Sequence, residues 1–331
     1  MLVYGDISPR TAAFVVVDLL KRGMPYMVFE KFGQSRELPM NKTMSMKFRR
    51  YEHLPLATTP LVEGVTPSSI KPNYTDVQAI LRQYGSIIEL TDVVADTHED
   101  PILKDNTVLI GEQAARTVET VRFNVLKAGT NVYYANGTAR TDVNTPLSLG
   151  KQRKITRGLM KQYGAKITSA VKSTPNFNTE SVLPSYIAIG HSDLGSDIRS
   201  MAGFIDVKDY GQVTPYENEI GAVEDCRYLL SQICESWADG GAAYAGSGTA
   251  MLSTTGVSAD VYPVFYIAAN SYAIIALKGK FAIVPMVLNP GVPRGGDGLG
   301  QRGTIGWKTM QTALILNDAW FARLESAVTD L

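Results

Sequence analysis

Residues 95–129, ADTHEDPILKDNTVLIGEQAARTVETVRFNVLKAG, carry the longest helix signal in this chain of 331 residues. Asp96 and Thr97 can cap the start of a helix there, and Gly129 can end it. Apolar side chains recur in steps of seven, four, four, three and four, at Leu103, Ile110, Ala114, Val118, Val121 and Val125. Since a helix rises about 1.5 Å per residue, this spacing predicts a single-faced helix of roughly 40 Å over about 98–128.

An extended arm is predicted on the N-terminal side of this helix. Residues 43–54 alternate apolar and polar side chains, and residues 74–90 give a second strand-like segment. The segment between them favours extended backbone without ladder donors, because it contains Pro55, Pro60, Pro67 and Pro72. A two-stranded arm with an irregular tip is marginally stable alone in water, so we expect it to lie on another surface.

The remaining sequence predicts a mixture of helices and short strands. A first helix over about 9–20 is apolar nearly all round and is therefore expected to be buried. Asn136-Gly137 predicts a hairpin, and a second long helix is expected over about 145–164. From 180 to 290 short strands predominate, and the apolar tail 301–325 is strand-like.

The composition is that of an ordinary globular protein. Apolar residues make up 45% and charged residues 19% of the chain. Lys+Arg and Asp+Glu both number 32, so no overall field would draw the protein to nucleic acid or to a membrane. Cys226 and Cys234 match neither a redox pair nor half of a metal site, which favours a reducing compartment. No apolar run approaches the roughly 20 residues that span a bilayer, so we expect no membrane partner and no metal.

One glycine motif raises the alternative of a nucleotide-binding enzyme. Residues 298–303, GLGQRG, match the G-x-G-x-x-G pattern, which needs a helix opening on it and a further strand beyond. Only 28 residues follow Gly303. Ile305 and Trp307 alternate with polar residues around Gly306, which predicts a strand directly after the motif. We therefore expect a structural loop here and no cofactor.

Two other segments could suggest catalysis. His191, Ser192 and Asp193 are adjacent, but neighbouring residues do not face one another as a triad requires, so Ser192 or Asp193 is expected to cap a helix. The glycine-rich segment 240–256 lacks the Lys-Ser/Thr pair of a phosphate-binding loop and is expected to be a surface loop. Neither segment predicts an enzyme.

Charge is segregated along the chain. Residues 217–239 carry six acids and a single base, Arg227. Residues 143–179 contain no acid and seven bases, which are Lys151, Arg153, Lys154, Arg157, Lys161, Lys166 and Lys172. This pattern is typical either of solvated faces of opposite sign or of a polarised subunit that meets copies of itself, or nucleic acid on its basic side.

The order of these elements resembles the major capsid protein of tailed bacteriophages, with the Hong Kong 97-type fold that encapsulins share. The strings that carry the resemblance are similar to the N-four-like phage major capsid family and span residues 4 to 309. They are YGDISPRTA (4–12), MKFRRYEHLPLATTPLVEGVTP (46–67), TDVVADTHEDP (91–101), NVLKAGTNVYYANGTARTDVN (124–144), DVYPVFYIAANSYAIIALKG (260–279) and NPGVPRGGDGLGQRGTIGWKT (289–309).

This resemblance implies an α+β fold in five parts. They are an N-terminal arm (1–38), an extended loop (39–92), a peripheral domain with the spine helix (93–179), an axial domain (180–284) and C-terminal return strands of the peripheral domain (285–331). It implies a non-enzymatic protein that assembles through hexamers and pentamers into an icosahedral head shell around double-stranded DNA. Portal, scaffolding and decoration proteins are the implied partners, and the virion is the implied location after assembly in the host cytoplasm. The alternatives are a cellular encapsulin-like shell protein and an α/β nucleotide-binding oxidoreductase that uses residues 298–303.

Candidate contact residues follow from these expectations. Subunit contacts are expected from Arg49, Arg50 and Tyr51 on the extended loop. Arg294 and Arg302 are further candidates, and they lie in residues 293–303, which contain the G-x-G-x-x-G motif and which we call the glycine-rich loop. A basic patch is expected to face the packaged DNA or a neighbouring subunit, and it comprises Lys151, Lys154, Arg157 and Lys161.

Overall fold

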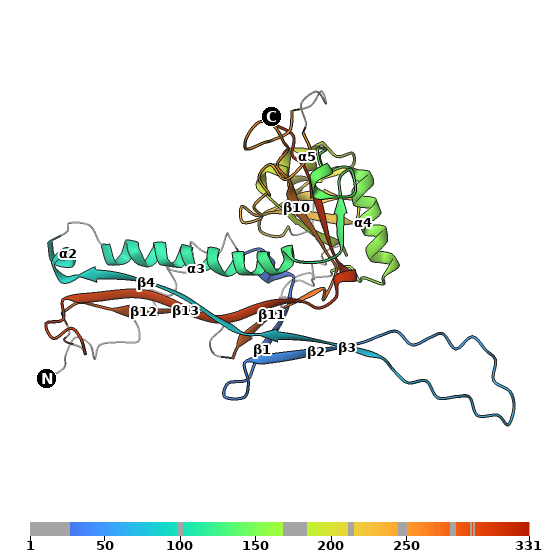
Figure 1. Ribbon diagram of the computed structural model, residues 1–331, viewed down its shortest axis with the longest axis horizontal. Coiled ribbons are helices and arrows are strands. Elements are labelled where there is room, and N and C mark those ends of the chain that lie inside the picture. The colour runs from blue at the N-terminus through green and yellow to red at the C-terminus, as the bar shows by residue number, and fades with distance from the viewer. Residues whose placement is uncertain are drawn as a thin grey trace, which may run out of the picture.

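The protein consists of an elongated body, a compact domain beside one end of it, and a long protruding arm (Figure 1). The elongated body contains the longest helix, α3, and the compact domain contains α4 and α5. The arm extends beyond both on the side of α4. The computed structural model describes residues 27–97, 102–167, 184–210, 215–243, 250–278, 283–291, 293 and 295–330.

The elongated body is a five-stranded sheet with α3 lying along it. The 14-residue β13 organises this sheet, because β4, β11 and β12 all pair with it in antiparallel register. Ile110 and Ala114 of α3 pack against Ile305 and Trp307 of β13. The elements are β1 (Gln34–Leu38), β4 (Arg82–Thr91), α2 (Asp92–Thr97), α3 (Ile102–Lys127), β11 (Tyr272–Leu277), β12 (Val284–Leu288) and β13 (Arg302–Ile315).

The predicted long helix is confirmed as α3, with one difference in its buried face. Ile110, Ala114 and Val118 are buried as the spacing predicts. Nearer the C-terminal end, Phe123 and Leu126 are the buried apolar residues, and they pack into the core of the compact domain. The N-terminal part of α3 therefore packs on the elongated body and its C-terminal part on the compact domain. The buried face of the helix changes between these two parts.

The compact domain is built on a seven-stranded sheet in the order β5-β14-β10-β6-β9-β8-β7. Alternate residues of β10 enter two different cores, Val264 on one face and Phe265 on the other. α4 and α5 cover the first face, and η3 (Phe29–Lys31) with the end of α3 covers the second. The other elements are β5 (Val132–Tyr134), α4 (Leu149–Lys161), β6 (Tyr186–Gly190), α5 (Gly195–Ser200), β7 (Phe204–Asp206), β8 (Glu219–Val223), β9 (Cys226–Leu230), β10 (Tyr262–Ile267) and β14 (Phe321–Ser326).

The predicted two-stranded arm is confirmed. β2 (Ser45–Tyr51) and β3 (Tyr74–Ile80) form an antiparallel pair that is separate from both larger sheets. Met46 and Phe48, which alternate with polar residues, pack against a small core at the base of the arm. The segment predicted as one strand over 74–90 is split at Leu81, because β3 pairs with β2 and β4 pairs with β13.

One local prediction is wrong, and another is confirmed with a later start. Asn136-Gly137 forms a turn, with φ of 66° at Gly137, but not a hairpin, because β5 pairs in parallel with β14 and the chain continues into η4 (Arg140–Asp142). The second long helix begins at Leu149, because Pro146 before it forms a β-bridge with Ala327. The first predicted helix, over 9–20, lies outside the described residues.

Strand pairing groups the elements differently from the predicted residue ranges. β4, within the predicted extended loop 39–92, belongs to the elongated body, and so does β11 from the predicted axial range 180–284. β14, within 285–331, pairs with β10 in the compact domain, and α4, within 93–179, packs there too. The chain crosses between the two bodies more often than contiguous ranges allow. The names peripheral and axial refer to positions in a shell and stay predictions.

Candidate assembly surfaces

The arm carries the largest run of exposed side chains among the described residues. Every side chain from Arg49 to Asp76 is exposed. Monomeric proteins rarely display contiguous apolar surface in this way. The exposed apolar side chains of the tip are Leu54 (56%), Leu56 (87%), Leu61 (77%), Val62 (67%), Val65 (62%) and Ile70 (51%).

The base of the arm is held together by its own polar and aromatic contacts. Arg49 donates to both carboxylate oxygens of Asp76, at 2.8 and 3.0 Å, and its guanidinium lies 4.1 Å from the ring centre of Tyr74. Tyr51 meets Tyr74 edge-on at 6.3 Å. Arg49 therefore joins the two strands, whereas Arg50 and Tyr51 present exposed side chains to a potential neighbour.

The glycine-rich loop leads directly into a strand, as predicted. Gly296 and Gly300 have φ of 92° and 68°, a region that favours glycine. The Asp297 carboxylate accepts the backbone N–H of Arg302 at 2.8 Å, which lowers the pKa of Asp297. Arg302 opens β13 with its side chain exposed, and Arg294 lies outside the described residues. A strand after the motif excludes the helix that a dinucleotide site requires there.

The predicted basic patch splits in two on α4. The buried face of this helix comprises Gln152, Ile155, Thr156 and Leu159. Lys154, Arg157 and Lys161 are all exposed, and at 100° per residue they lie on the opposite side of the helix. Lys151 is half-buried and donates to the backbone carbonyl of Tyr134 at 3.1 Å, so it lies apart from the other three. We call Lys154, Arg157 and Lys161 the α4 stripe.

The acid-rich segment 217–239 is largely neutralised within the same chain. Its acids pair with bases from several elements, two of them from the basic segment 143–179. The pairs are Lys31–Glu217 (2.7 Å), Arg227–Glu219 (2.7 Å), Lys166–Asp225 (2.7 Å) and Arg153–Glu224. The predicted opposite charges therefore meet in part inside one subunit.

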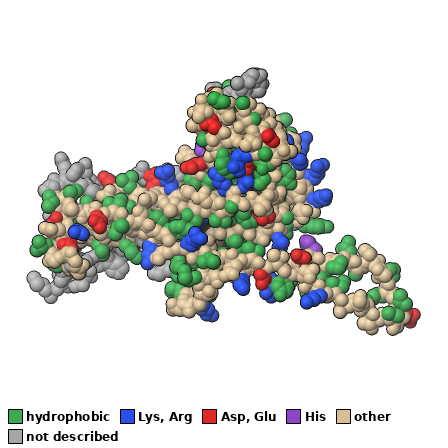
Figure 2. Space-filling view, in the orientation of Figure 1, with side chains coloured by type: hydrophobic (Ala, Val, Ile, Leu, Met, Phe, Trp, Pro, Cys, Tyr) green, Lys and Arg blue, Asp and Glu red, His purple; other side chains and the backbone are tan. Residues whose placement is uncertain are grey.

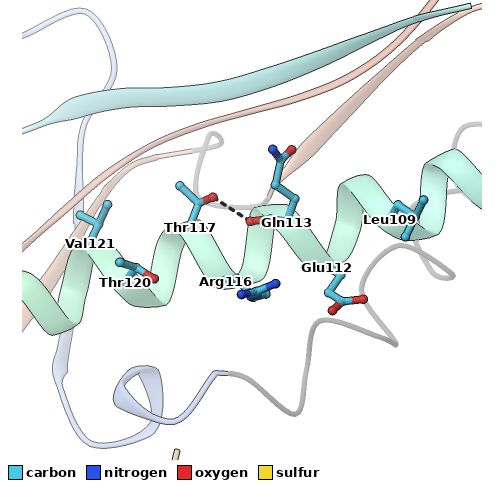
Figure 3. A pocket seen from close by; sticks show the side chains of 7 residues that line it. All are labelled: Leu109, Glu112, Gln113, Arg116, Thr117, Thr120 and Val121. Carbon is cyan, nitrogen blue, oxygen red and sulfur yellow. Dashed lines mark hydrogen bonds between the residues drawn. The ribbon is translucent and has the colours of Figure 1, made fainter. Parts of the chain in front are cut away.

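A shallow groove runs along α3 (Figure 3). The Thr117 hydroxyl donates to the backbone carbonyl of Gln113 at 2.7 Å, and Gln113 accepts from the indole of Trp307 at 3.4 Å. The lining has one cation, Arg116, and one carboxylate, Glu112, so it offers an open polar surface rather than a catalytic centre. Its other lining residues are Leu109, Thr120 and Val121.

Comparison with known proteins decides among the classes of function. A family model described as phage capsid protein matches residues 74–322. The chain belongs to the phage capsid protein family. It is the family of shell proteins that the sequence resemblance predicts, and no curated protein matches the chain.

Solved structures confirm the capsid fold. The capsid of Ralstonia phage GP4 matches at a TM-score of 0.66 with 10% identity, over 90% of this chain and 87% of that chain. The head of Helicobacter pylori bacteriophage KHP40 matches at 0.59 with 10% identity, over 89% and 87%. The SrpI encapsulin from Synechococcus elongatus matches at 0.51 with 7% identity, over 90% and 86%. Identities this low show the Hong Kong 97-type fold alone, and the family match favours the phage capsid over the encapsulin.

The catalytic candidates of this capsid protein have structural roles. His191 accepts the backbone N–H of Asp193 at 3.3 Å, so His191 caps the short turn there instead of Ser192 or Asp193 as predicted. The Asp193 carboxylate accepts the Tyr262 hydroxyl at 2.8 Å. Over the described ranges, no cluster of three His, Cys, Asp or Glu could hold a metal ion, and no helix is long and apolar enough to cross a membrane.

One buried group escaped the sequence analysis. Glu119 of α3 is fully buried and accepts the backbone N–H groups of Val28 and Phe29, both at 2.6 Å. Burial raises the pKa of Glu119, and Arg122, 3.3 Å away, opposes that rise. The capsid protein thus fixes the backbone of Val28 and Phe29 to the long helix. A charged residue next to Val118 in the predicted apolar face was the available signal.

Proposed function

We propose that this chain is the major capsid protein of a tailed phage. It associates through hexameric and pentameric capsomers into an icosahedral head shell that encloses double-stranded DNA. The family match and the capsid structures of similar fold support a structural rather than enzymatic role and a location in the virion capsid. Binding to portal, scaffolding and decoration proteins, and assembly in the host cytoplasm, belong to the same proposal.

The arm is the observation that carries this proposal. Its apolar tip side chains are exposed in the single subunit, and the arm projects away from both other bodies. Burial of apolar surface is worth about 25 cal/mol per Å², so a chain that leaves this surface in water forgoes stability that only a second chain can supply. An arm that lies on a neighbour makes a head-to-tail contact, and such contacts form a ring when the rotation between successive copies closes.

The exposed residues beside the arm and the glycine-rich loop take part in the same contacts. We expect Arg50 and Tyr51 to bind the neighbour beneath the arm, while Arg49 keeps the arm paired through Asp76. Arg302, exposed at the start of β13, is proposed as a contact at the far end of the elongated body, and Arg294 is proposed as a contact from the sequence alone.

The test compares two sets of substitutions in the arm tip. Replacing Leu54, Leu56, Leu61 and Val62 together with Ser removes apolar side chains, whereas replacing Thr58, Thr59, Ser68 and Ser69 together with Ala serves as the matched control. Sedimentation velocity and negative-stain microscopy should find capsomers or shells for the wild type and the control only. Normal shells from the Ser variant would contradict the role of the arm.

The encapsulin alternative is separable by the contents of the particles. Particles purified from the natural source should hold nuclease-protected DNA of uniform length if the protein is a phage capsid. A protein cargo without DNA would instead favour an encapsulin-like compartment, which has the same fold.

A further inference from the structure

We propose that the α4 stripe binds carboxylates on the compact domain of the next copy in a capsomer ring. This contact rests on the proposed function, because it needs the ring. The α4 stripe would be a second surface, besides the arm, through which one copy recognises the next. The partner is a second copy of this chain.

The stripe is available for an external anion. Lys154, Arg157 and Lys161 lie opposite the buried face of α4 and span about 10 Å, at about 1.5 Å per residue. Within the described ranges they form no ion pair, whereas nearby Arg153 and Lys166 are already paired with Glu224 and Asp225. Among the described residues, the nearby acids pair with other bases, and these three cations have no acidic partner.

The stripe lies on the same side of the molecule as the arm. Figure 1 shows α4 at the edge of the compact domain from which the arm extends. The arm approaches the chain just after α4, where the rings of His53 and Tyr163 are 5.3 Å apart. A neighbour that is held by the arm is therefore brought next to α4.

Exposed acids of the compact domain offer the complementary charge. In a head-to-tail ring, the side that carries the arm and α4 meets the opposite side of the next copy. Figure 2 shows Lys and Arg side chains along the α4 edge, and separate Asp and Glu side chains elsewhere on the compact domain. Asp209 and Glu235 of the compact domain are exposed and form no ion pair with the described residues.

The balance of charge favours a second copy over DNA. A chain with 32 bases and 32 acids has no net charge that would attract the phosphates of DNA. A stripe of three cations can neutralise only a few phosphates. Complementary patches on two copies instead fix orientation and suppress wrong pairings. DNA binding by the stripe is the outcome that the test below must exclude.

The test reverses the charge of the stripe and then restores complementarity. The variant Lys154→Glu, Arg157→Glu, Lys161→Glu should need an at least about tenfold higher concentration to form capsomers, because like charges then meet across the contact. Adding subunits with Asp209→Lys and Glu235→Lys should recover mixed assemblies. The matched control, Arg199→Glu, Lys278→Glu, Lys308→Glu, changes three exposed bases elsewhere by the same amount and should assemble normally.

The outcomes separate this contact from the proposed function. Circular dichroism must show each variant folded, and a 30-base-pair duplex is titrated against each at several salt concentrations. Normal assembly of the reversed variant with loss of duplex binding would overturn the proposal in favour of a DNA-facing stripe. A reversed variant that assembles and binds duplex like the control would also overturn it. A wild type that never assembles would overturn the proposed function, and this contact with it.

Discussion

The compact domain and the arm place their apolar side chains in opposite environments. Every residue of β10 in the compact domain is buried, whereas every side chain from Arg49 to Asp76 in the arm is exposed. Both segments are extended and rich in apolar residues, so the difference lies in what surrounds them. The compact domain buries its apolar side chains against its own chain. Those of the arm need another copy to cover them.

Buried charges in the compact domain follow the same rule. Glu325 is fully buried and accepts from Arg140 at 2.8 and 2.9 Å, with Arg323 3.0 Å away. Trp237 lies beneath this cluster, 3.6 Å from the Arg140 guanidinium. Charges in the interior have partners from the same chain, whereas the cations of the α4 stripe form no ion pair with any residue that the structure describes. Pairing of individual charged residues therefore distinguishes the interior of the compact domain from the surfaces proposed to contact another copy.

The largest expected effect comes from opening the core of the compact domain. Phe265 is fully buried and stacks on Phe321 at 5.5 Å, with Phe29 and Phe123 edge-on to it. Phe265→Ala should lower the free energy of unfolding by about 3–5 kcal/mol, because it leaves a cavity among rigid neighbours. Urea unfolding of the dissociated subunit measures it.

The matched substitution in the arm tests whether its apolar side chains are as exposed as those of the compact domain are buried. Leu56→Ala, at a side chain that is 87% exposed, should leave the unfolding of the subunit unchanged and weaken assembly instead. A loss of subunit stability at Leu56 comparable to that at Phe265 would show that the arm is packed within its own chain.

A smaller loss is expected at the buried carboxylate of α3. Glu119→Ala leaves the N–H groups of Val28 and Phe29 without their acceptor and should cost about 3 kcal/mol. Glu119→Gln keeps an acceptor of nearly the same shape and should cost clearly less. Hydrogen exchange at Val28 and Phe29 provides the local readout. Unchanged protection of these two amides in the Ala variant would contradict the contact.

Elements with a strong local pattern could be predicted from the sequence. The long helix, the two-stranded arm and the strand after GLGQRG all follow from the spacing of apolar residues and from proline and glycine positions. Each is defined by neighbours within a few turns or pleats. The irregular tip of the arm also follows, because its prolines lack the N–H donors that strand pairing needs.

Contacts between distant segments could not be predicted. The division of residues 74–90 between two sheets depends on β13, more than 200 residues away. The pairing of Arg153 with Glu224, and of Lys166 with Asp225, likewise depends on how the compact domain closes. Periodicity carries no information about such partners. For this reason the basic patch was predicted as four residues, although Lys151 belongs to a different contact.

The pairing within the arm should be visible without a change in stability. Arg49, chiefly through its hydrogen bonds, holds the pKa of Asp76 below its ordinary value. Because the folded pKa is lowered, the pair is formed above it and is lost as the pH falls through it. Arg49→Ala should return the pKa of Asp76 to the ordinary range, measured by carboxyl NMR, with no change in subunit unfolding. A pKa that stays low would assign it to another cause.

The smallest expected effect concerns the two cysteine thiols, which should not react in the folded subunit. Cys226 and Cys234 are free and fully buried, and burial raises the pKa of both thiols. The native subunit should therefore react with neither a thiol reagent nor an oxidant, and both thiols should react after unfolding. Rapid reaction of either thiol in the folded subunit would show that the compact domain opens, contrary to its self-sufficient packing.

The central claim is that the arm of one copy is completed by another copy. Hydrogen–deuterium exchange of residues 52–73, measured in assembled particles and in dissociated subunits, tests it most directly. We predict exchange at least about tenfold slower in the particles, while β10 is equally protected in both states. Equal exchange of the arm tip in the two states would contradict the claim.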